Sequence, residues 1–381
     1  MQKKGRNRQS VVSIANGPRR KTACWPAWGL LLVLAAFKPG LGCTAFVMKG
    51  WGGALLAKNL DGPVGEGYVF VNKKNVAKTA CPGESPQPLR WTSKYGSVTF
   101  NQFGREFPLG GMNEAGLVVE ELNAPSEYPL LDRRPALNAF QWVQYQLDTQ
   151  ASVKGVLDSD SRLRVAQFLA GLHYLVTDRK GNTAVIEFVK GRMVAYSGQD
   201  LPVRALANNG YAESLRYLKF HRGFGGQRQV SNGPEPRERF VRAASLLKDL
   251  DLPGQRPSVD TAFLILRSVA QEDTQWSIVY YPTRGLVFFK TKASRRLKVI
   301  VLEDFDFRCS SPVLMLPILA EYGGRLSRSF TAYDPQKNKL LLETVFGWLR
   351  DLGDIATSLP AGMIRKMADY PDGCLCRQGR E

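Results

Sequence analysis

Histidine is nearly absent from this sequence, which has only His173 and His221 among its 381 residues. Neither histidine stands beside a cysteine, so the sequence does not indicate a cysteine nucleophile activated by a neighbouring imidazole. Both are also far in sequence from Cys374 and Cys376, and those two cysteines are too closely spaced for a zinc knuckle. We therefore expect no metal site.

The patterns typical of nucleic-acid-binding and repeat proteins are missing as well. There is no zinc-finger spacing, no aromatic RNA-binding motif, no long run of lysine and arginine, and no internal repeat. The net charge of +18 is partly local, because residues 1–42 hold eight basic and no acidic side chains, whereas residues 43–381 hold 44 basic and 34 acidic ones. A hydrophobic content of 44% excludes a disordered chain, and we expect no nucleic-acid partner.

No apolar run reaches the length of a typical membrane-spanning helix. The longest, residues 23–37, falls short of the roughly 20 residues that such a helix needs, and Lys38-Pro39-Gly40 follows it. A basic stretch before this run and the small residues Gly40 and Gly42 after it are typical of a cleaved export signal. We expect residues 1–42 to be removed, leaving a soluble protein that starts at Cys43, is secreted or periplasmic, and has no stable membrane insertion.

Two alternatives to cleavage remain open. The apolar run could stay as an N-terminal membrane anchor. Leu41-Gly42-Cys43 could instead be a lipoprotein acceptor, although Gly40 stands where such boxes usually have leucine. Cys43 would then be acylated, and the chain would be a lipid-anchored envelope protein that binds its ligand without cleaving it.

The six cysteines allow several pairings. Cys24 would leave with the leader, and if Cys43 is reserved for chemistry the body of the chain keeps Cys81, Cys309, Cys374 and Cys376. Four cysteines can form two disulfides in three ways. Cys81 and Cys309 are equally consistent with buried thiols.

Strand and helix patterns occur in separate blocks along residues 43–381. Strands are predicted at residues 43–48, 54–60, 67–72, 97–103, 117–122, 172–177, 183–189, 193–197, 275–281, 286–291 and 297–302. Helices are predicted at residues 138–148, 212–220, 237–250, 259–270 and 336–350. This arrangement indicates an α+β fold of antiparallel sheets covered by helices. Residues 223–226, rich in glycine, are predicted to form a mobile loop, because no strand leads into them as a phosphate-binding loop would require.

A cysteine at the first position of a mature chain has two reactive groups. Its thiol has a reference pKa near 8.5 and its α-amine one of about 7.7 to 8.0, so the amine can serve as the base for its own thiol. Cys43 takes this position if the leader is cut where predicted. Taken alone it is a weak signal, since a small apolar residue at the start of a strand would look the same.

Five motifs follow Cys43-Thr44 in a fixed order. They are Lys58-Asn59-Leu60-Asp61; residues 111–117, GMNEAGL, continuing to Leu122-Asn123; Ala207-Asn208-Asn209; residues 238–243, ERFVRA; and a late hairpin of residues 274–280 and 288–291. This order resembles the choloylglycine hydrolase family, which includes bile salt hydrolases and penicillin V acylases. The resemblance spans about residues 43–291 and implies an N-terminal-nucleophile (Ntn) hydrolase. The implied fold is an αββα sandwich of two antiparallel sheets flanked by helices, formed by residues 43–381 as a single domain.

The resemblance also implies catalytic roles for six residues: Cys43, Lys58, Asp61, Asn123, Asn208 and Arg239. Cys43 would be the nucleophile, with its α-amine as general base and then acid, and Asp61 would hold that amine. The Asn208 side chain and the Asn123 backbone N–H would stabilise the oxyanion, and such donors typically contribute about 10² to 10³ each in rate. Arg239 would lie beside the sulfur and favour the thiolate. From the residues alone, Asn208 resembles part of a turn and Arg239 an exposed position on a helix.

The sequence departs from the family pattern at several points. Lys58 replaces an arginine, which keeps the positive charge but loses the planar fork that binds two acceptors at once. Ala207 replaces a threonine. The interval from Asn208 to Arg239 is short beside that of bile salt hydrolases, which suggests that a substrate-shaping loop is missing. Asn123 is the residue type found in bile salt hydrolases, whereas penicillin V acylases have tyrosine there.

The activity that the resemblance implies is hydrolysis of a linear, non-peptide amide bond. The expected partner is a small N-acyl amide, and bile salts, penicillin V, N-acyl homoserine lactones and other N-acyl amines all fit this class. No metal or organic cofactor is expected. The sequence leaves the oligomeric state open, and a homo-oligomer is compatible with it.

Overall fold

The computed structural model of the protein describes residues 42–50, 52–81, 87–252, 255, 257–352, 359 and 362–377. The predicted leader therefore lies outside the described residues, except for Gly42. Within these ranges, no helix has both the length and the apolar character that crossing a membrane requires.

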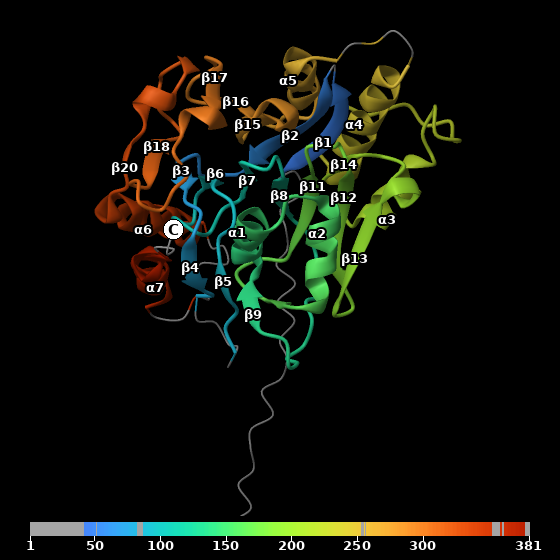
Figure 1. The fold of residues 1–381 in the computed structure, drawn as a ribbon. Helices are drawn as coiled ribbons and strands as arrows, with labels where there is room; N and C mark the ends of the chain where they lie inside the picture. Colours follow the sequence, from blue (N-terminus) through green and yellow to red (C-terminus); the bar gives the residue numbers. More distant parts are fainter. Residues whose placement is uncertain are drawn as a thin grey trace, which may run out of the picture. The chain divides into compact units, whose positions relative to one another are not determined.

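Two large sheets form the centre of the fold (Figure 1). The first has seven strands in the order β14 (Ala205–Leu206), β1 (Thr44–Gly50), β2 (Gly53–Asp61), β15 (Thr274–Tyr281), β16 (Leu286–Thr291), β17 (Lys298–Val301) and β19 (Gly324–Arg325). The second has nine in the order β13 (Arg192–Ser197), β12 (Thr183–Val189), β11 (Leu172–Thr177), β8 (Val118–Asn123), β7 (Gly110–Asn113), β6 (Ser97–Asn101), β3 (Tyr68–Asn72), β18 (Leu314–Pro317) and β20 (Thr331–Ala332). Apart from β17 and β19, neighbouring strands in both sheets are antiparallel.

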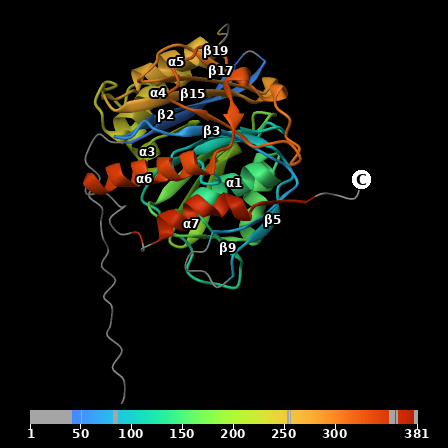
Figure 2. The same cartoon turned by 90° about the vertical axis from the view of Figure 1, so that its left-hand side faces the viewer.

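Helices cover the outer face of each sheet (Figures 1 and 2). Helices α4 (Pro236–Leu250) and α5 (Val259–Ser268) pack against the first sheet, and α1 (Ala139–Thr149) packs against β7 and β8 of the second. The remaining helices are α2 (Val153–Asp158), α3 (Tyr211–Leu218), α6 (Pro335–Asp351) and α7 (Met363–Asp369). The layers run helix, sheet, sheet, helix, which confirms the predicted α+β sandwich.

Aromatic side chains fill the space between the two sheets. Phe100, on β6 of the second sheet, lies with its ring centre 6.4 Å from Trp276, 6.2 Å from Tyr280 and 5.3 Å from Phe289, all on the first sheet. Burial of rings of this size contributes strongly to stability. The two sheets therefore share one core.

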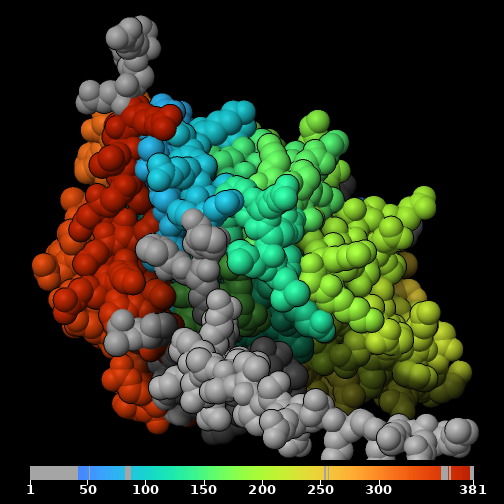
Figure 3. Space-filling view, turned by 90° about the horizontal axis from the view of Figure 1, so that it is seen from below, coloured from blue at the N-terminus to red at the C-terminus, as the bar shows by residue number. Residues whose placement is uncertain are grey.

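Two small sheets and a disulfide complete the fold. The small sheets comprise β9 (Ala136–Asn138) with β10 (Arg164–Ala166), and β21 (Leu375–Cys376) with β4 (Val76–Thr79) and β5 (Arg90–Thr92). Figure 3 shows the C-terminal residues, in red, beside the cyan residues near β4 and β5. Cys309 is bonded to Cys376, whereas Cys81 and Cys374 are free thiols. The described part of the chain thus has one disulfide, and Cys309 belongs to it and is not a buried thiol.

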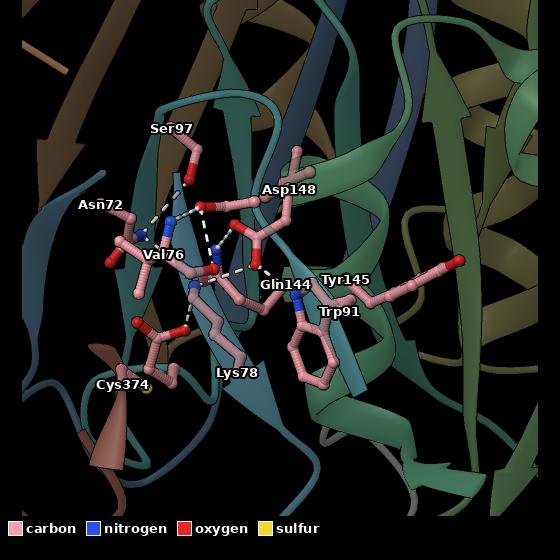
Figure 4. Close-up of polar contacts among 12 residues, drawn as sticks. Asn72, Val76, Lys78, Trp91, Ser97, Gln144, Tyr145, Asp148 and Cys374 are labelled. Atoms are coloured by element: carbon pink, nitrogen blue, oxygen red, sulfur yellow. Dashed lines mark hydrogen bonds and ion pairs between the residues drawn. The ribbon is translucent and has the colours of Figure 1, made fainter. Parts of the chain in front are cut away.

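A buried ionic cluster lies between α1 and the small sheet of β4 and β5 (Figure 4). Lys78 Nζ lies 2.5 Å from a carboxylate oxygen of Glu106 and 2.9 Å from one of Asp148. Trp91 donates to Asp148 at 2.7 Å, and Arg105 pairs with Glu106 at 3.2 Å. The two cations balance the charge of the two carboxylates. Through Asp148, the cluster connects α1 to Lys78 on β4 and Trp91 on β5.

Candidate active site

Cys43 stands immediately before β1 and is only 5% exposed. Strand β1 pairs on one side with β2, where Thr44 lies opposite Asn59, and on the other with β14, where Ala45 lies opposite Leu206. These two pairings bring the ends of the Lys58–Asp61 and Ala207–Asn209 motifs to Cys43, the predicted nucleophile. The motifs meet because β1 is an inner strand with both neighbours in place.

Asp61, at the end of β2, lies against Cys43. Its backbone N–H lowers the pKa of the Cys43 thiol, while its carboxylate raises it. Thr274 Oγ1 donates to one carboxylate oxygen at 2.5 Å, and Gln271 Nε2 donates to the other at 3.1 Å. Burial raises the pKa of Asp61 to about 6, although these two bonds and the Arg239 guanidinium act in the opposite direction.

The peptide bond before Cys43 is held within the same site. The carbonyl oxygen of Gly42 accepts from Gln271 Nε2 at 2.9 Å. A Cβ atom on Gly42 would overlap with the side-chain amide of Asn208, so only glycine fits here without a shift. In this uncleaved chain the Cys43 nitrogen is an amide, and it has no basic lone pair.

Arg239 is fully buried at the start of α4. Its guanidinium donates to the carbonyl oxygen of Cys43 at 2.8 Å, to Asn208 Oδ1 at 3.0 Å, and to the hydroxyl of Thr44. It also lies 3.7 Å from an Asp61 carboxylate oxygen. The interpretation of Arg239 as an exposed helix residue is wrong, because it continues the buried stripe of α4 formed by Ala243 and Leu247 at four-residue spacing.

The predicted role of Arg239, to favour the thiolate of Cys43 in the cleaved chain, stays a prediction. The hydrogen bonds of Arg239 go to oxygen acceptors. Burial raises the pKa of the Cys43 thiol to about 12, outweighing the opposite effect of the Lys58 ammonium.

Asn208 and Asn123 meet across the site. Asn208 Nδ2 donates to the Asn123 carbonyl oxygen at 2.8 Å. The next N–H along β8, that of Ala124, bonds to Gly171 beside β11. Because successive N–H groups of a strand point to opposite edges, the Asn123 N–H points to the edge where Asn208 lies. Two donors of the predicted oxyanion site thus share one edge of β8.

Lys58 points from β2 toward the second sheet, where it forms ion pairs with two carboxylates. Its Nζ lies 2.9 Å from Glu120 Oε2 and 3.6 Å from Glu121 Oε1, and all three side chains are almost fully buried. Tyr280 donates to the other Glu120 oxygen at 2.5 Å. Burial alone would lower the pKa of Lys58, but the two carboxylates raise it, so the ammonium stays charged.

The sequence analysis missed Glu120 and Glu121. Adjacent acids inside the apolar strand Val118–Leu122 were the available signal, because a strand that is buried on both faces can hold acids only with partners. Gly110, opposite Glu120, leaves the room for that carboxylate, since a Cβ atom there would overlap with it. Gln271 and Thr274, the partners of Asp61, were missed as well.

The described residues contain no group of three or more His, Cys, Asp or Glu side chains that could hold a metal ion. The groups that this arrangement itself brings together are a thiol, carboxylates, amides and cationic side chains. A buried thiol beside a carboxylate and two convergent amide donors suits attack on a carbonyl carbon followed by stabilisation of the resulting oxyanion.

Comparison with known proteins finds relatives in sequence and in fold. The model of the linear amide C–N hydrolases, choloylglycine hydrolase family, matches residues 43–315. Penicillin V acylase of Pectobacterium atrosepticum is 28% identical over 267 residues, which cover 59% of this chain and 71% of that protein. The penicillin V acylase structure from Agrobacterium tumefaciens is 26% identical, with a TM-score of 0.66, and covers 77% of this chain and 98% of that one.

A more distant structure shares the fold. An arginine-to-leucine variant of the conjugated bile acid hydrolase from Clostridium perfringens is 17% identical, with a TM-score of 0.61, covering 74% of this chain and 97% of that one. The family model covers well over half of the chain, and the same sandwich recurs in these structures. This chain belongs to the choloylglycine hydrolase family of linear amide C–N hydrolases, enzymes that cleave non-peptide carbon–nitrogen bonds of small-molecule amides.

Proposed function

We propose that this chain is an exported amidase whose nucleophile is Cys43, freed as the N-terminal residue by removal of residues 1–42. The observation that carries the proposal is the convergence on one residue. Arg239 bonds the Cys43 carbonyl oxygen, Asp61 acts electrostatically on the Cys43 thiol, and the Asn208 amide lies on the edge of β8 that carries Asn123. Each of these residues comes from a different segment of the chain.

In the proposed reaction the Cys43 thiol loses its proton to the Cys43 α-amine, and the sulfur attacks the amide carbon of the substrate. The Asn208 side chain and the Asn123 N–H donate to the oxyanion that forms. The amine then gives its proton to the leaving nitrogen as the carbon–nitrogen bond breaks, which leaves a thioester and a free amine. Water attacks the thioester, again with the α-amine as base, and releases the carboxylic acid.

The other charged residues would position these groups. Asp61, fixed by Thr274 and Gln271, would accept a hydrogen bond from the freed α-ammonium. Arg239 would fix the backbone of Cys43 and orient Asn208. Lys58, held by Glu120, would supply positive charge behind the sulfur.

The substrate in this proposal is an N-acyl compound of the bile salt, penicillin V or N-acyl amine type. Penicillin V acylases among the similar proteins support this range. The leader pattern supports release outside the cytoplasm, either to the periplasm or to the medium.

The experiment compares two proteins that differ by one residue at the start. One begins at Cys43 and the other at Gly42, with both N-termini verified by intact mass. Gly42 turns the α-amine into an amide, which cannot accept the thiol proton, while the thiol itself is unchanged. We expect the Gly42 protein to lose at least the roughly 10² to 10⁴ in kcat that general acid–base catalysis contributes, with release of amine from a panel of N-acyl amides as the readout.

Cys43→Ala, made in the protein that begins at Cys43, is the control and should be inactive. Full turnover by the Gly42 protein would overturn the N-terminal-nucleophile mechanism even if Cys43 proved essential. Expression of the full chain tests the export step separately. An intact mass that retains residues 1–42, or that carries a diacylglyceryl group on Cys43, would contradict it.

A further inference from the structure

His173 and Glu187 form a buried pair on two neighbouring strands, the first of which pairs with the strand that carries Asn123. His173 is fully buried on β11, and its Nδ1 lies 3.2 Å from Glu187 Oε1 on the adjacent strand β12. The same Oε1 accepts from the backbone N–H of Tyr211 at 2.8 Å. One carboxylate oxygen therefore joins a strand of the second sheet to the first residue of α3.

Glu187 acts as the cap of α3. The residue before the helix, Gly210, offers no side-chain acceptor, so the N–H of Tyr211 is satisfied from another strand. A carboxylate at this end of a helix is also favoured by the helix dipole. The start of α3 is consequently fixed by Glu187.

The segment that carries Asn208, residues 207–210, is held at both of its ends by contacts with neighbouring elements. On one side, Leu206 of β14 pairs with Ala45 of β1. On the other, Tyr211 is held by Glu187 and donates its hydroxyl to the Val203 carbonyl oxygen at 2.7 Å. Only residues 207–210 lie between these anchors, so the placement of the Asn208 amide depends on both.

The other oxyanion residue is attached to the same pair. Asn123 lies opposite Leu172 in the β8–β11 ladder, and Leu122 lies opposite His173. The contacts thus form a closed ring, from Asn123 through β11, Glu187 and Tyr211 to Asn208, whose Nδ2 returns to the Asn123 carbonyl oxygen at 2.8 Å.

We infer that His173 and Glu187 are positioning residues that hold the Asn208 and Asn123 donors at the spacing the oxyanion requires. The inference rests on the proposed function for what the donors do, but the ring of contacts stands without it. Because a carboxylate only accepts hydrogen bonds, the contact assigns the Nδ1 proton of His173 to the bond with Glu187. His173 Nε2 has no hydrogen-bond partner among the described residues, so its one polar contact there is the bond to Glu187.

The test compares Glu187→Ala with Glu187→Gln in the protein that begins at Cys43. Alanine removes both bonds of Oε1, whereas glutamine keeps an amide oxygen that can accept from the Tyr211 N–H. Misplaced donors weaken the transition state more than the substrate complex, so Glu187→Ala should lower kcat at least tenfold while KM changes less than about twofold. Glu187→Gln should restore most of the kcat.

The matched control is Tyr174→Phe, on the same strand as His173. Tyr174 is also fully buried, and its hydroxyl donates at 2.9 Å to the carbonyl oxygen of Ala139, where α1 begins. Loss of that bond should lower the melting temperature and leave kcat unchanged. Equal kcat losses in Tyr174→Phe and Glu187→Ala, or no rescue by Glu187→Gln, would overturn the positioning role.

Amide hydrogen exchange provides a readout that does not need activity. Glu187→Ala should speed exchange in residues 207–211 relative to Tyr174→Phe, and unchanged exchange there would contradict the inference. If the wild-type protein cleaves no N-acyl amide, the proposed function fails, and the exchange comparison still decides whether the ring of contacts positions residues 207–211.

Discussion

The guanidinium of Arg239 binds the carbonyl oxygen of Cys43 at 2.8 Å. The arginine comes from a helix nearly two hundred residues further along the chain, and the bond fixes the backbone of the proposed nucleophile. The same side chain reaches Asn208 at 3.0 Å. One buried cation thus contacts both the proposed nucleophile, Cys43, and a proposed oxyanion donor, Asn208.

Replacement of Arg239 should therefore impair catalysis beyond the loss of charge. Arg239→Lys keeps the charge but cannot reach the Cys43 carbonyl and Asn208 together. Each lost charge-assisted hydrogen bond corresponds to about 1.5–3 kcal/mol, so we expect kcat to fall by at least about tenfold. The control is alkylation of Cys43 by iodoacetamide, monitored by mass spectrometry, which shows that the thiol is intact. A wild-type kcat in Arg239→Lys would show that the two simultaneous bonds of the guanidinium are not needed for catalysis.

Lys58 provides the second prediction. Lys58→Met leaves Glu120 and Glu121 buried without their cation, and breaking a buried pair in this way costs about 3–5 kcal/mol. We expect a large loss of stability in urea together with a large loss of activity. Lys58→Arg keeps the charge and should retain most of the activity. If all three proteins have equal activity, Lys58 does not belong to the site.

The free energy of unfolding should depend on pH through the titration of Asp61. Burial raises the pKa of Asp61 to about 6 from an ordinary value of 3.8, so the folded protein holds this proton more tightly than the unfolded chain does. The contribution to stability is complete below about pH 4 and is lost as the pH rises through 6. The loss amounts to about 3 kcal/mol.

Asp61→Asn removes this dependence. The comparison uses proteins that begin at Gly42, because the Cys43 nitrogen is then an amide, as it is in the uncleaved chain. In these proteins the variant and the wild type should have similar unfolding free energies near pH 4. The variant should become the more stable of the two by pH 7. Urea unfolding at several pH values measures the difference, and parallel curves across this range would rule out the raised pKa.

The disulfide provides a prediction that concerns stability alone. Cys309 and Cys376 are 67 residues apart in sequence, and a loop of this length gives a disulfide a stabilising effect of about 2–5 kcal/mol. Cys309→Ser should lower the melting temperature and leave kcat at 25 °C unchanged. Cys374→Ser is the matched control, because Cys374 is a free thiol two residues from the bond. A melting temperature lowered equally by both substitutions would mean that the bond itself does not contribute.

The long elements of the fold were predictable from sequence, and the short ones were not. Strands β11, β12 and β16 have the predicted bounds, because each is a run of β-formers between clear turns. Strands of two to four residues, such as β14 and β21, carry too few side chains for a pattern and exist only because a neighbouring strand pairs with them. Residues 223–226 do lie in a loop, although a bridge between His221 and Arg228 closes it.

The site was predictable only in part for a different reason. The order of the motifs predicts that Cys43, Asp61, Asn208 and Arg239 belong to one site. In the structure Arg239 contacts the other three. The partners of Lys58 could not follow from the motif, because the lysine meets Glu120 across the gap between two sheets. Contacts of that kind depend on how the sheets stack, which no local pattern encodes.

The buried side chains around Cys43 have a further consequence for the moment of cleavage. Asp61, Glu120 and Glu121 outnumber the cations Lys58 and Arg239 by one, and Glu121 Oε2 has no hydrogen-bond partner among the described residues. A buried charge without a counter-ion is costly, and burial raises the pKa of all three carboxyl groups in the uncleaved chain. A cut before Cys43 would release an α-ammonium next to Asp61 and bring the formal sum to zero. Cleavage would then change the charge balance of the site in one step: as an ammonium the new terminus supplies the missing counter-ion, and as a neutral amine it is the base for the thiol.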